Sequence, residues 1–204
     1  LTTVTHSIDE AIDTMVSSAE KGEAISIGLV GNIVELWERC VERDINVDLG
    51  SDQTSLHNPY QGGYFPADRT YEESAMMLSE NPELFRKEVQ MTLLRHADAI
   101  NTMSDRGMYF WDYGNAFLLE ASRVGADVVN EDGTFRYPSY VEDIMGPLCF
   151  DYGFGPYRWV CTSGDPRDLE KTDQIAATVL RGMLDEAPAD VRQQIVDNLR
   201  WMNK

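Results

Sequence analysis

The sequence is short of positive charge. Its 204 residues include 17 Lys and Arg against 35 Asp and Glu, which gives a formal net charge of −18 at pH 7. Proteins that bind a phosphate backbone or an anionic membrane surface need an excess of Lys and Arg on some face. The composition therefore argues against nucleic acid or a membrane as a partner. Anionic small molecules remain possible, because one or two cations and backbone N–H groups are enough to hold them.

Long apolar runs and paired cysteines are also missing. No stretch approaches the roughly 18 apolar residues of a transmembrane helix, and the first residues do not have the pattern of a signal peptide. The widely spaced Cys40, Cys149 and Cys161 form no CxxC pair and no metal-ligand spacing, so we expect no metal site. This cysteine content fits a reducing, cytoplasmic compartment. The chain starts at Leu1, and we expect it to be a fragment or a processed product.

Apolar periodicity predicts strands that alternate with helices. Residues 24–30 form a short apolar run typical of a buried strand, and Asn32 is a candidate N-cap for the helix that follows. Residues 45–49 predict a second strand. Residues 24–49 therefore predict a strand–helix–strand crossover in a parallel sheet.

The same plan recurs later in the chain. A helical pattern covers residues 71–104, and its second part begins at Asn81-Pro82. Strands are predicted at residues 108–111 and 158–162, and each is followed by a helix. The second of these helices is capped by Ser163-Gly164-Asp165-Pro166 and runs to about Leu184. The predicted fold is α/β, a parallel sheet flanked by helices with a helical insertion around 70–105, in one domain over residues 1–204.

Several loops that follow strand ends could bind a ligand. They lie at residues 28–32, 52–66, 112–115 and 163–165. In open α/β sheets, ligands bind at the edge where strands end and helices begin, because helix N-termini and free N–H groups converge there. This arrangement favours an anionic or nucleotide ligand. The full GxGxxG fingerprint is absent, and residues 28–31 supply only a GxxG.

Individual residues leave alternatives open. His57 lies in the polar 52–66 loop, where it could contact a ligand or brace the loop. His96, on the apolar face of a long helix, is interpreted as a core histidine with one satisfied nitrogen. Tyr113 could stack on a ring, bind a ligand or simply pack. Arg158 either binds a carboxylate ligand or pairs with an internal acid, and composition alone favours the internal pair.

Four motifs lie along most of the chain: Gly28-Leu29-Val30-Gly31-Asn32, Ser51-Asp52-Gln53-Thr54-Ser55-Leu56-His57-Asn58-Pro59, Trp111-Asp112-Tyr113-Gly114-Asn115, and Gly155-Pro156-Tyr157-Arg158-Trp159-Val160 with Ser163-Gly164-Asp165-Pro166. In this order and spacing, the four motifs resemble the urocanase family. The forms of residues 62–63 and 110–113 are closer to the eukaryotic-type branch.

The resemblance implies a Rossmann-like domain of a hydro-lyase of histidine degradation. Such an enzyme hydrates urocanate to 4-imidazolone-5-propanoate and is typically a homodimer. Tightly held NAD⁺ acts as an electrophile toward the imidazole, with no net hydride transfer.

The resemblance also implies site residues. Arg158 matches an arginine that is a candidate for binding the urocanate carboxylate. Ile33 and Leu56 stand where many relatives have Ala, so their contacts would be made by the backbone. The implied NAD⁺ contacts are Asn32, Ile33, Gln53, Thr54, Ser55, Leu56, His57, Tyr64, Phe65 and Tyr113.

The resemblance covers only part of the family's length. In the family, the Gly-rich pyrophosphate turn precedes the position of Leu1, and the catalytic cysteine, in a Cys-Gly-Ser context, follows Lys204. We therefore expect the 204 residues to be an NAD-domain portion that is inactive alone. Two other interpretations stay open: an ordinary NAD-dependent oxidoreductase, and a stand-alone NAD-binding or interaction domain without activity.

Overall fold

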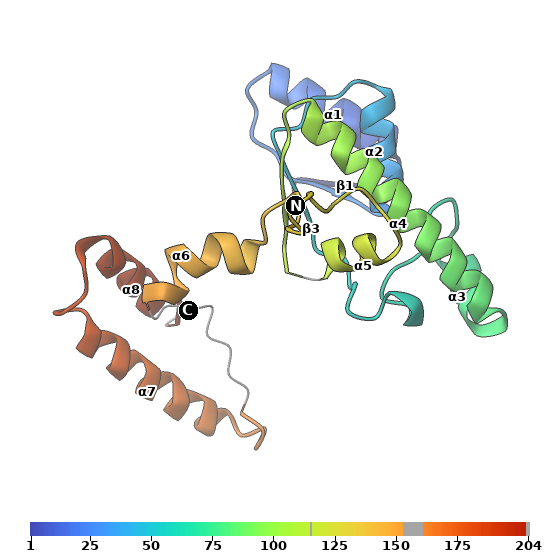
Figure 1. The fold of residues 1–204 in the computed structure, drawn as a ribbon. Helices are drawn as coiled ribbons and strands as arrows, with labels where there is room; N and C mark the ends of the chain where they lie inside the picture. Colours follow the sequence, from blue (N-terminus) through green and yellow to red (C-terminus); the bar gives the residue numbers. More distant parts are fainter. Residues whose placement is uncertain (115, 153–160, 203–204) are drawn as a thin grey trace. The chain divides into compact units, whose positions relative to one another are not determined.

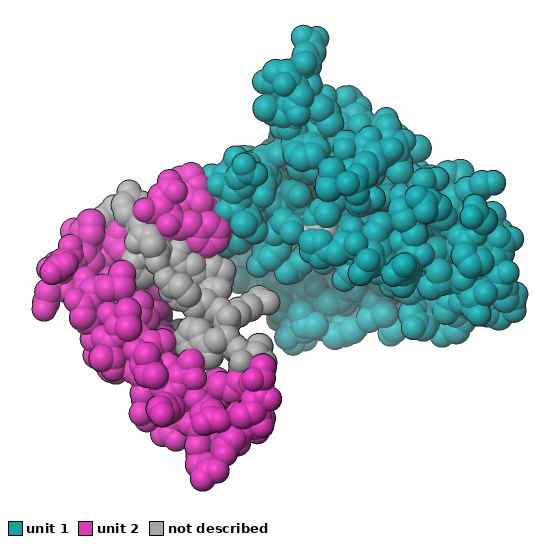
Figure 2. All heavy atoms as spheres, turned by 60° about the horizontal axis from the view of Figure 1, so that its bottom comes forward, with its two compact units in different colours: residues 1–144 teal, residues 145–204 magenta. Residues whose placement is uncertain are grey.

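The computed structural model describes residues 1–114, 116–152 and 161–202. The chain divides into two compact units, Leu1–Ile144 and Met145–Lys204 (Figures 1 and 2). The sequence patterns predict one domain, whereas each unit has a hydrophobic core of its own. Helical periodicity reports only that a face is buried, so it does not show which core receives that face.

Unit 1 contains the strands and most of the helices of the described residues. Its elements, in chain order, are β1 (Thr3–Thr5), α1 (Ile8–Glu20), β2 (Ile27–Leu29), α2 (Ile33–Glu42), β3 (Leu49–Asp52), the 3₁₀ turn η1 (Pro59–Gln61), α3 (Tyr71–Glu80), α4 (Pro82–Asp105), β4 (Tyr109–Asp112), α5 (Phe117–Arg123) and the π-helical turn η2 (Tyr140–Met145), which ends at the boundary.

The described strands form two parallel pairs. β1 pairs with β2, and β3 pairs with β4. Parallel pairing is as predicted, but the crossover over residues 24–49 is wrong, because β2 and β3 lie in different pairs. Ile45 and Val47, in the connecting segment, are partly buried against the core, and the strand begins only at Leu49, where β4 supplies a partner.

Helix α4 organises the core of unit 1. Asn81 caps it by accepting a hydrogen bond from Leu84 N–H at 3.1 Å, and Pro82 occupies the first turn, as predicted. The helix packs against α2, α3 and α5 (Figure 1). One face is fully buried at four-residue and three-residue intervals, and its members are Phe85, Val89, Leu93, His96, Ile100 and Met103.

The β3–β4 pair has one buried face and one open face. Gly50 and Phe110 are opposite each other and buried, whereas Leu49 and Tyr109 are opposite each other and exposed. Because side chains alternate along a strand, the next buried positions are Asp52 and its partner in register, Asp112. Two buried carboxyl groups therefore mark the end of this pair.

Unit 2 is helical in its described part. It contains α6 (Gly146–Leu148), the 3₁₀ turn η3 (Phe150–Tyr152), α7 (Pro166–Met183) and α8 (Ala189–Met202). Asp165 caps α7 by accepting from Arg167 N–H at 2.9 Å, which confirms the predicted helix start. Arg158 and most of the strand predicted over residues 158–162 lie outside the described residues. Among the helices described, none has the length and apolarity needed to cross a membrane.

Candidate functional site

The candidate site begins where β3 and β4 end side by side. The Oδ1 atom of Asp52 accepts from Thr54 N–H at 3.1 Å, and that of Asp112 accepts from Gly114 N–H at 3.2 Å. The Thr54 hydroxyl donates to the same Asp52 oxygen at 2.7 Å. Each buried aspartate thus turns the chain sharply out of its strand. The two loops therefore leave the same edge of the pair, which is where α/β sheets bind ligands.

The 52–66 loop is compact although it contains little regular structure. Asn58 C=O accepts from the N–H groups of Gln61, at 3.2 Å, and Gly63, at 3.1 Å. Gly62 has φ +88°, and a Cβ on Gly63 would lie 2.3 Å from the carbonyl oxygen of Ser55. The double glycine is therefore required, first for a left-handed turn and then for close backbone contact.

The loop displays polar side chains around a buried anchor. Leu56 is completely buried, whereas Gln53, Ser55 and His57 are exposed. The predicted backbone role of Leu56 is compatible with this burial. The three exposed side chains carry amide, hydroxyl and imidazole groups, which are able to donate and accept hydrogen bonds at this edge.

The start of α2 is tied to the end of the loop. Asn32 Oδ1 accepts from Val34 N–H at 3.0 Å, as an N-cap does. Its Nδ2 donates to both carbonyls of residues 65–66, at 3.1 and 3.2 Å. Glu35 Oε1 also accepts from Asp68 N–H, at 2.8 Å. The Asn32 amide is therefore engaged at both ends in holding the fold, so a contact to a ligand would come from backbone N–H groups of this turn.

Helix α4 fastens the same segment from the other side. Thr92 Oγ1 accepts from Ala67 N–H at 3.1 Å, and Arg95 donates to Asp68 Oδ2 at 2.6 Å. Arg95 also donates to both carboxylate oxygens of Glu38 in α2, at 2.7 and 2.6 Å. The positive charge of Arg95 is thus balanced by two acids.

His96 lies in the middle of this arrangement. Its imidazole is fully buried, Nδ1 is 3.0 Å from the hydroxyl of Tyr64, and Nε2 is 3.9 Å from Asp52 Oδ2. Within the described residues Nε2 has no hydrogen-bond partner, so the prediction of a core histidine with one satisfied nitrogen is confirmed. Burial lowers the pKa of His96 to about 4, although Asp52 and Glu38 act in the opposite direction.

The predicted aromatic contacts divide between interior and surface. The side chain of Tyr64 is buried, and burial raises its pKa well above 10, so its hydroxyl stays protonated. The Phe65 ring packs against Tyr71, at 5.3 Å between centroids. Tyr113 is 39% exposed and stacks on Tyr140, with centroids 5.0 Å apart and rings nearly parallel at 7°. Only Tyr113 of these three presents an exposed ring at the edge.

The structure unites most of the predicted contacts. Asn32 caps α2, Ile33 is half-buried in its first turn, and the other predicted NAD⁺ contacts come from the 52–66 loop or the turn after β4. Asp52 and Asp112 were not among the predicted contacts. Their signal was an Asp one to three residues after a predicted strand, two residues before the Thr or Gly whose N–H it binds.

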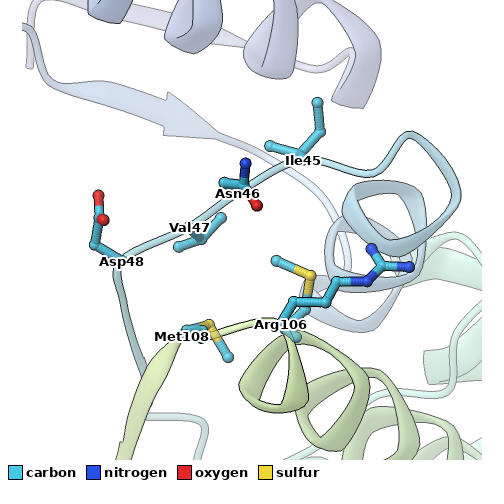
Figure 3. A pocket seen from close by; sticks show the side chains of 8 residues that line it. Ile45, Asn46, Val47, Asp48, Arg106 and Met108 are labelled. Carbon is cyan, nitrogen blue, oxygen red and sulfur yellow. The ribbon is translucent and has the colours of Figure 1, made fainter.

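A cavity of about 300 Å³ lies at the opposite end of the same strands (Figure 3). Residues 45–48, just before β3, and residues 106–108, just before β4, form its walls with Met103. Its cation, Arg106, donates to Val41 C=O at 3.0 Å and pairs with Asp44 at 3.3 Å. None of the predicted contacts lines this cavity, so we do not assign the ligand to it.

Comparison with known proteins identifies the family. A protein-family model, the urocanase Rossmann-like domain, matches residues 1–144. The chain belongs to the urocanase family. A second family model, the urocanase C-terminal domain, matches residues 147–204, so the family's own division coincides with the two structural units. The predicted α/β, Rossmann-like class is confirmed.

Named relatives match nearly the whole chain. It is 50% identical over 203 residues to a probable urocanate hydratase of Caenorhabditis elegans. The matched region covers 97% of this chain and 30% of that protein. It is 49% identical over 210 residues to the urocanate hydratase of Mus musculus, with 98% and 31% covered. The urocanate hydratase of Homo sapiens is 47% identical over the same shares. The chain thus spans about three tenths of the length of these urocanases.

The double glycine provides a test of the loop geometry. We expect Gly63→Ala to lower the free energy of unfolding by about 1–3 kcal/mol, because the new Cβ would meet backbone oxygens that cannot move cheaply. Gly31→Ala is the matched control, since its Cβ would meet Leu29 at an ordinary 3.8 Å, and we expect a change within about 0.5 kcal/mol. Urea denaturation measures both, and equal stability of the two variants would contradict the geometry.

The low pKa of His96 predicts acid sensitivity. In the unfolded chain a histidine takes up its proton near pH 6.5, but buried His96 does so only near pH 4. Its contribution is therefore fully present above pH 6.5 and is lost as the pH falls toward 4. At about 1.4 kcal/mol per pH unit, the loss reaches about 3 kcal/mol.

Denaturation curves of wild type and His96→Asn at several pH values measure this effect. Carboxylates that do not face His96 contribute equally to both proteins, so we expect the stability difference between them to shrink as the pH falls from 6.5 to 4.5. A difference independent of pH would show that His96 titrates normally.

Proposed function

We propose that the protein carrying this chain is a urocanate hydratase that hydrates urocanate to 4-imidazolone-5-propanoate with NAD⁺ as its cofactor. The observation that carries this proposal is the identity of about 50% to urocanate hydratases over nearly all of the chain. The clustering of the predicted contacts at one edge of the β3–β4 pair supports it. We further propose that the intact enzyme is a homodimer.

The residues at this edge fit a dinucleotide. The first turn of α2 offers backbone N–H groups, and Gln53, Ser55 and His57 offer exposed hydrogen-bonding side chains beside it. The exposed ring of Tyr113 provides a surface on which an aromatic ring could lie. Because Arg95 is already balanced by Glu38 and Asp68, this chain's contacts to the dinucleotide would be made by neutral donors.

The bound cofactor would supply a cationic ring that draws electron density from the imidazole of the substrate. The role of this chain would be to position the side chains and N–H groups that contact the cofactor. The 52–66 loop holds its exposed side chains in one arrangement through Leu56 and the double glycine. Buried Asp52 and Asp112 keep the two loops at one edge.

Activity is tested on the complete polypeptide that the reading frame encodes. We expect purified protein to contain NAD⁺, to consume urocanate, and to show no net change in NADH absorbance. Net formation or loss of NADH would indicate an ordinary NAD-dependent oxidoreductase. Bound NAD⁺ without urocanate consumption would indicate a binding domain, and either result would contradict the proposal.

We also propose that Arg158 binds the urocanate carboxylate. We expect Arg158→Met to raise KM at least about 30-fold, because loss of one partner of a charged pair costs about 2 kcal/mol or more. Arg167→Met is the control, since Arg167 is exposed and pairs locally with Asp165. Steady-state kinetics with urocanate decides between them, and an unchanged KM for Arg158→Met would dismiss the assignment.

A further inference from the structure

One buried polar group has no place in the proposed ligand contacts. His96 is completely buried on α4, yet its two nitrogens face opposite ends of the 52–66 loop. Nδ1 lies 3.0 Å from the hydroxyl of Tyr64, where the loop returns to the core. Nε2 lies 3.9 Å from Asp52 Oδ2, where the loop begins. A single side chain thus lies within hydrogen-bond distance of Tyr64 and faces the carboxyl group of Asp52, two residues 12 positions apart in the sequence.

The ring is held in one orientation by its neighbours. The ring of Phe117 in α5 lies 4.7 Å from it, between centroids. One turn earlier on α4, Thr92 accepts from Ala67 N–H at 3.1 Å, which fixes the chain just after Tyr64. The imidazole therefore cannot turn away from either loop end without disturbing the packing of α4 on α5.

The charges around the ring select one tautomer. The carboxyl group of Asp52 on β3 faces Nε2, Glu38 approaches from α2, and Arg95 neutralises Glu38 through two hydrogen bonds. A lone pair on Nε2 would face the Asp52 oxygen and repel it, so the proton belongs on Nε2. Nδ1 then accepts a hydrogen bond from Tyr64.

We propose that His96 is the positioning residue of the 52–66 loop, and that it holds Tyr64 and Asp52 at the separation that NAD⁺ binding requires. Asp52 in turn orients Thr54 through its N–H and hydroxyl groups. Tyr64 follows the double glycine that closes the loop. The exposed contacts at residues 53, 55 and 57 lie between these two fastened ends. This inference rests on the proposed function, because that function supplies the ligand.

Three substitutions separate positioning from simple packing. His96→Asn keeps an acceptor near the Nδ1 position for Tyr64, and His96→Gln keeps a donor near the Nε2 position for Asp52. His96→Leu keeps similar volume but removes both. The measurements are the dissociation constant for NAD⁺ by calorimetry and amide hydrogen exchange over residues 53–65, on the complete encoded polypeptide.

We expect His96→Leu to weaken NAD⁺ binding at least 10-fold and to speed exchange in the loop, while exchange in α7 and α8 stays unchanged. His96→Asn should restore binding to within about 3-fold of wild type. In a His96→Leu background, Tyr64→Phe should add little, because their hydrogen bond is already lost. Unchanged binding and exchange in His96→Leu would overturn the proposal, as would equal losses in the Leu and Asn variants.

A spectroscopic measurement keeps the inference independent of ligand and of folding in the variants. Long-range ¹⁵N–¹H NMR of the wild-type protein should show His96 protonated on Nε2 at neutral pH, and a proton on Nδ1 would overturn the proposal. If wild type binds no NAD⁺, the proposed function fails. The His96 tautomer and loop exchange still test whether His96 holds the loop.

Discussion

Residues 64–68 are held between α2 and α4, and this constraint determines the shape of the candidate site. Asn32 and Glu35 bind the segment from α2, while Thr92 and Arg95 bind it from α4. Because α4 also packs its apolar face into the core, these hydrogen bonds attach the segment to a rigid part of unit 1. The loop before it then needs only local turns to present its polar side chains.

The acidic composition shapes the chemistry of this edge. Arginines in unit 1 are largely paired with acids of the same unit. Arg95 pairs with Glu38 and Asp68, and Arg69 pairs with Glu88 at 2.7 Å. Asp52 and Asp112 are buried at the strand ends, where their carboxyl groups accept hydrogen bonds from backbone N–H groups. An anionic ligand at this edge would therefore depend on neutral donors and helix N–H groups.

Local signals predicted the helix starts well. Asn32, Asn81 and Asp165 each cap the helix expected of them, because an N-cap is a contact between residues two or three positions apart. Strand pairing was predicted poorly. Residues 45–49 have the composition of a strand, but the β3 strand begins only where β4, about 60 residues later, offers hydrogen bonds. The same holds for the candidate site. Local motifs named its residues, but they could not predict which of those side chains are exposed.

By itself, the sequence determined the helices with their caps, the α/β class, the family through its four motifs, and the strongly negative net charge. Only the tertiary structure decided that the side chains of Asn32, Thr54 and Tyr64 form hydrogen bonds within the protein. It likewise decided that the side chains of residues 53, 55, 57 and 113 are exposed. It also decided that the chain divides into two units. The physical reason is that caps and periodicity are short-range, whereas burial and hydrogen-bond partners depend on segments far apart in the chain.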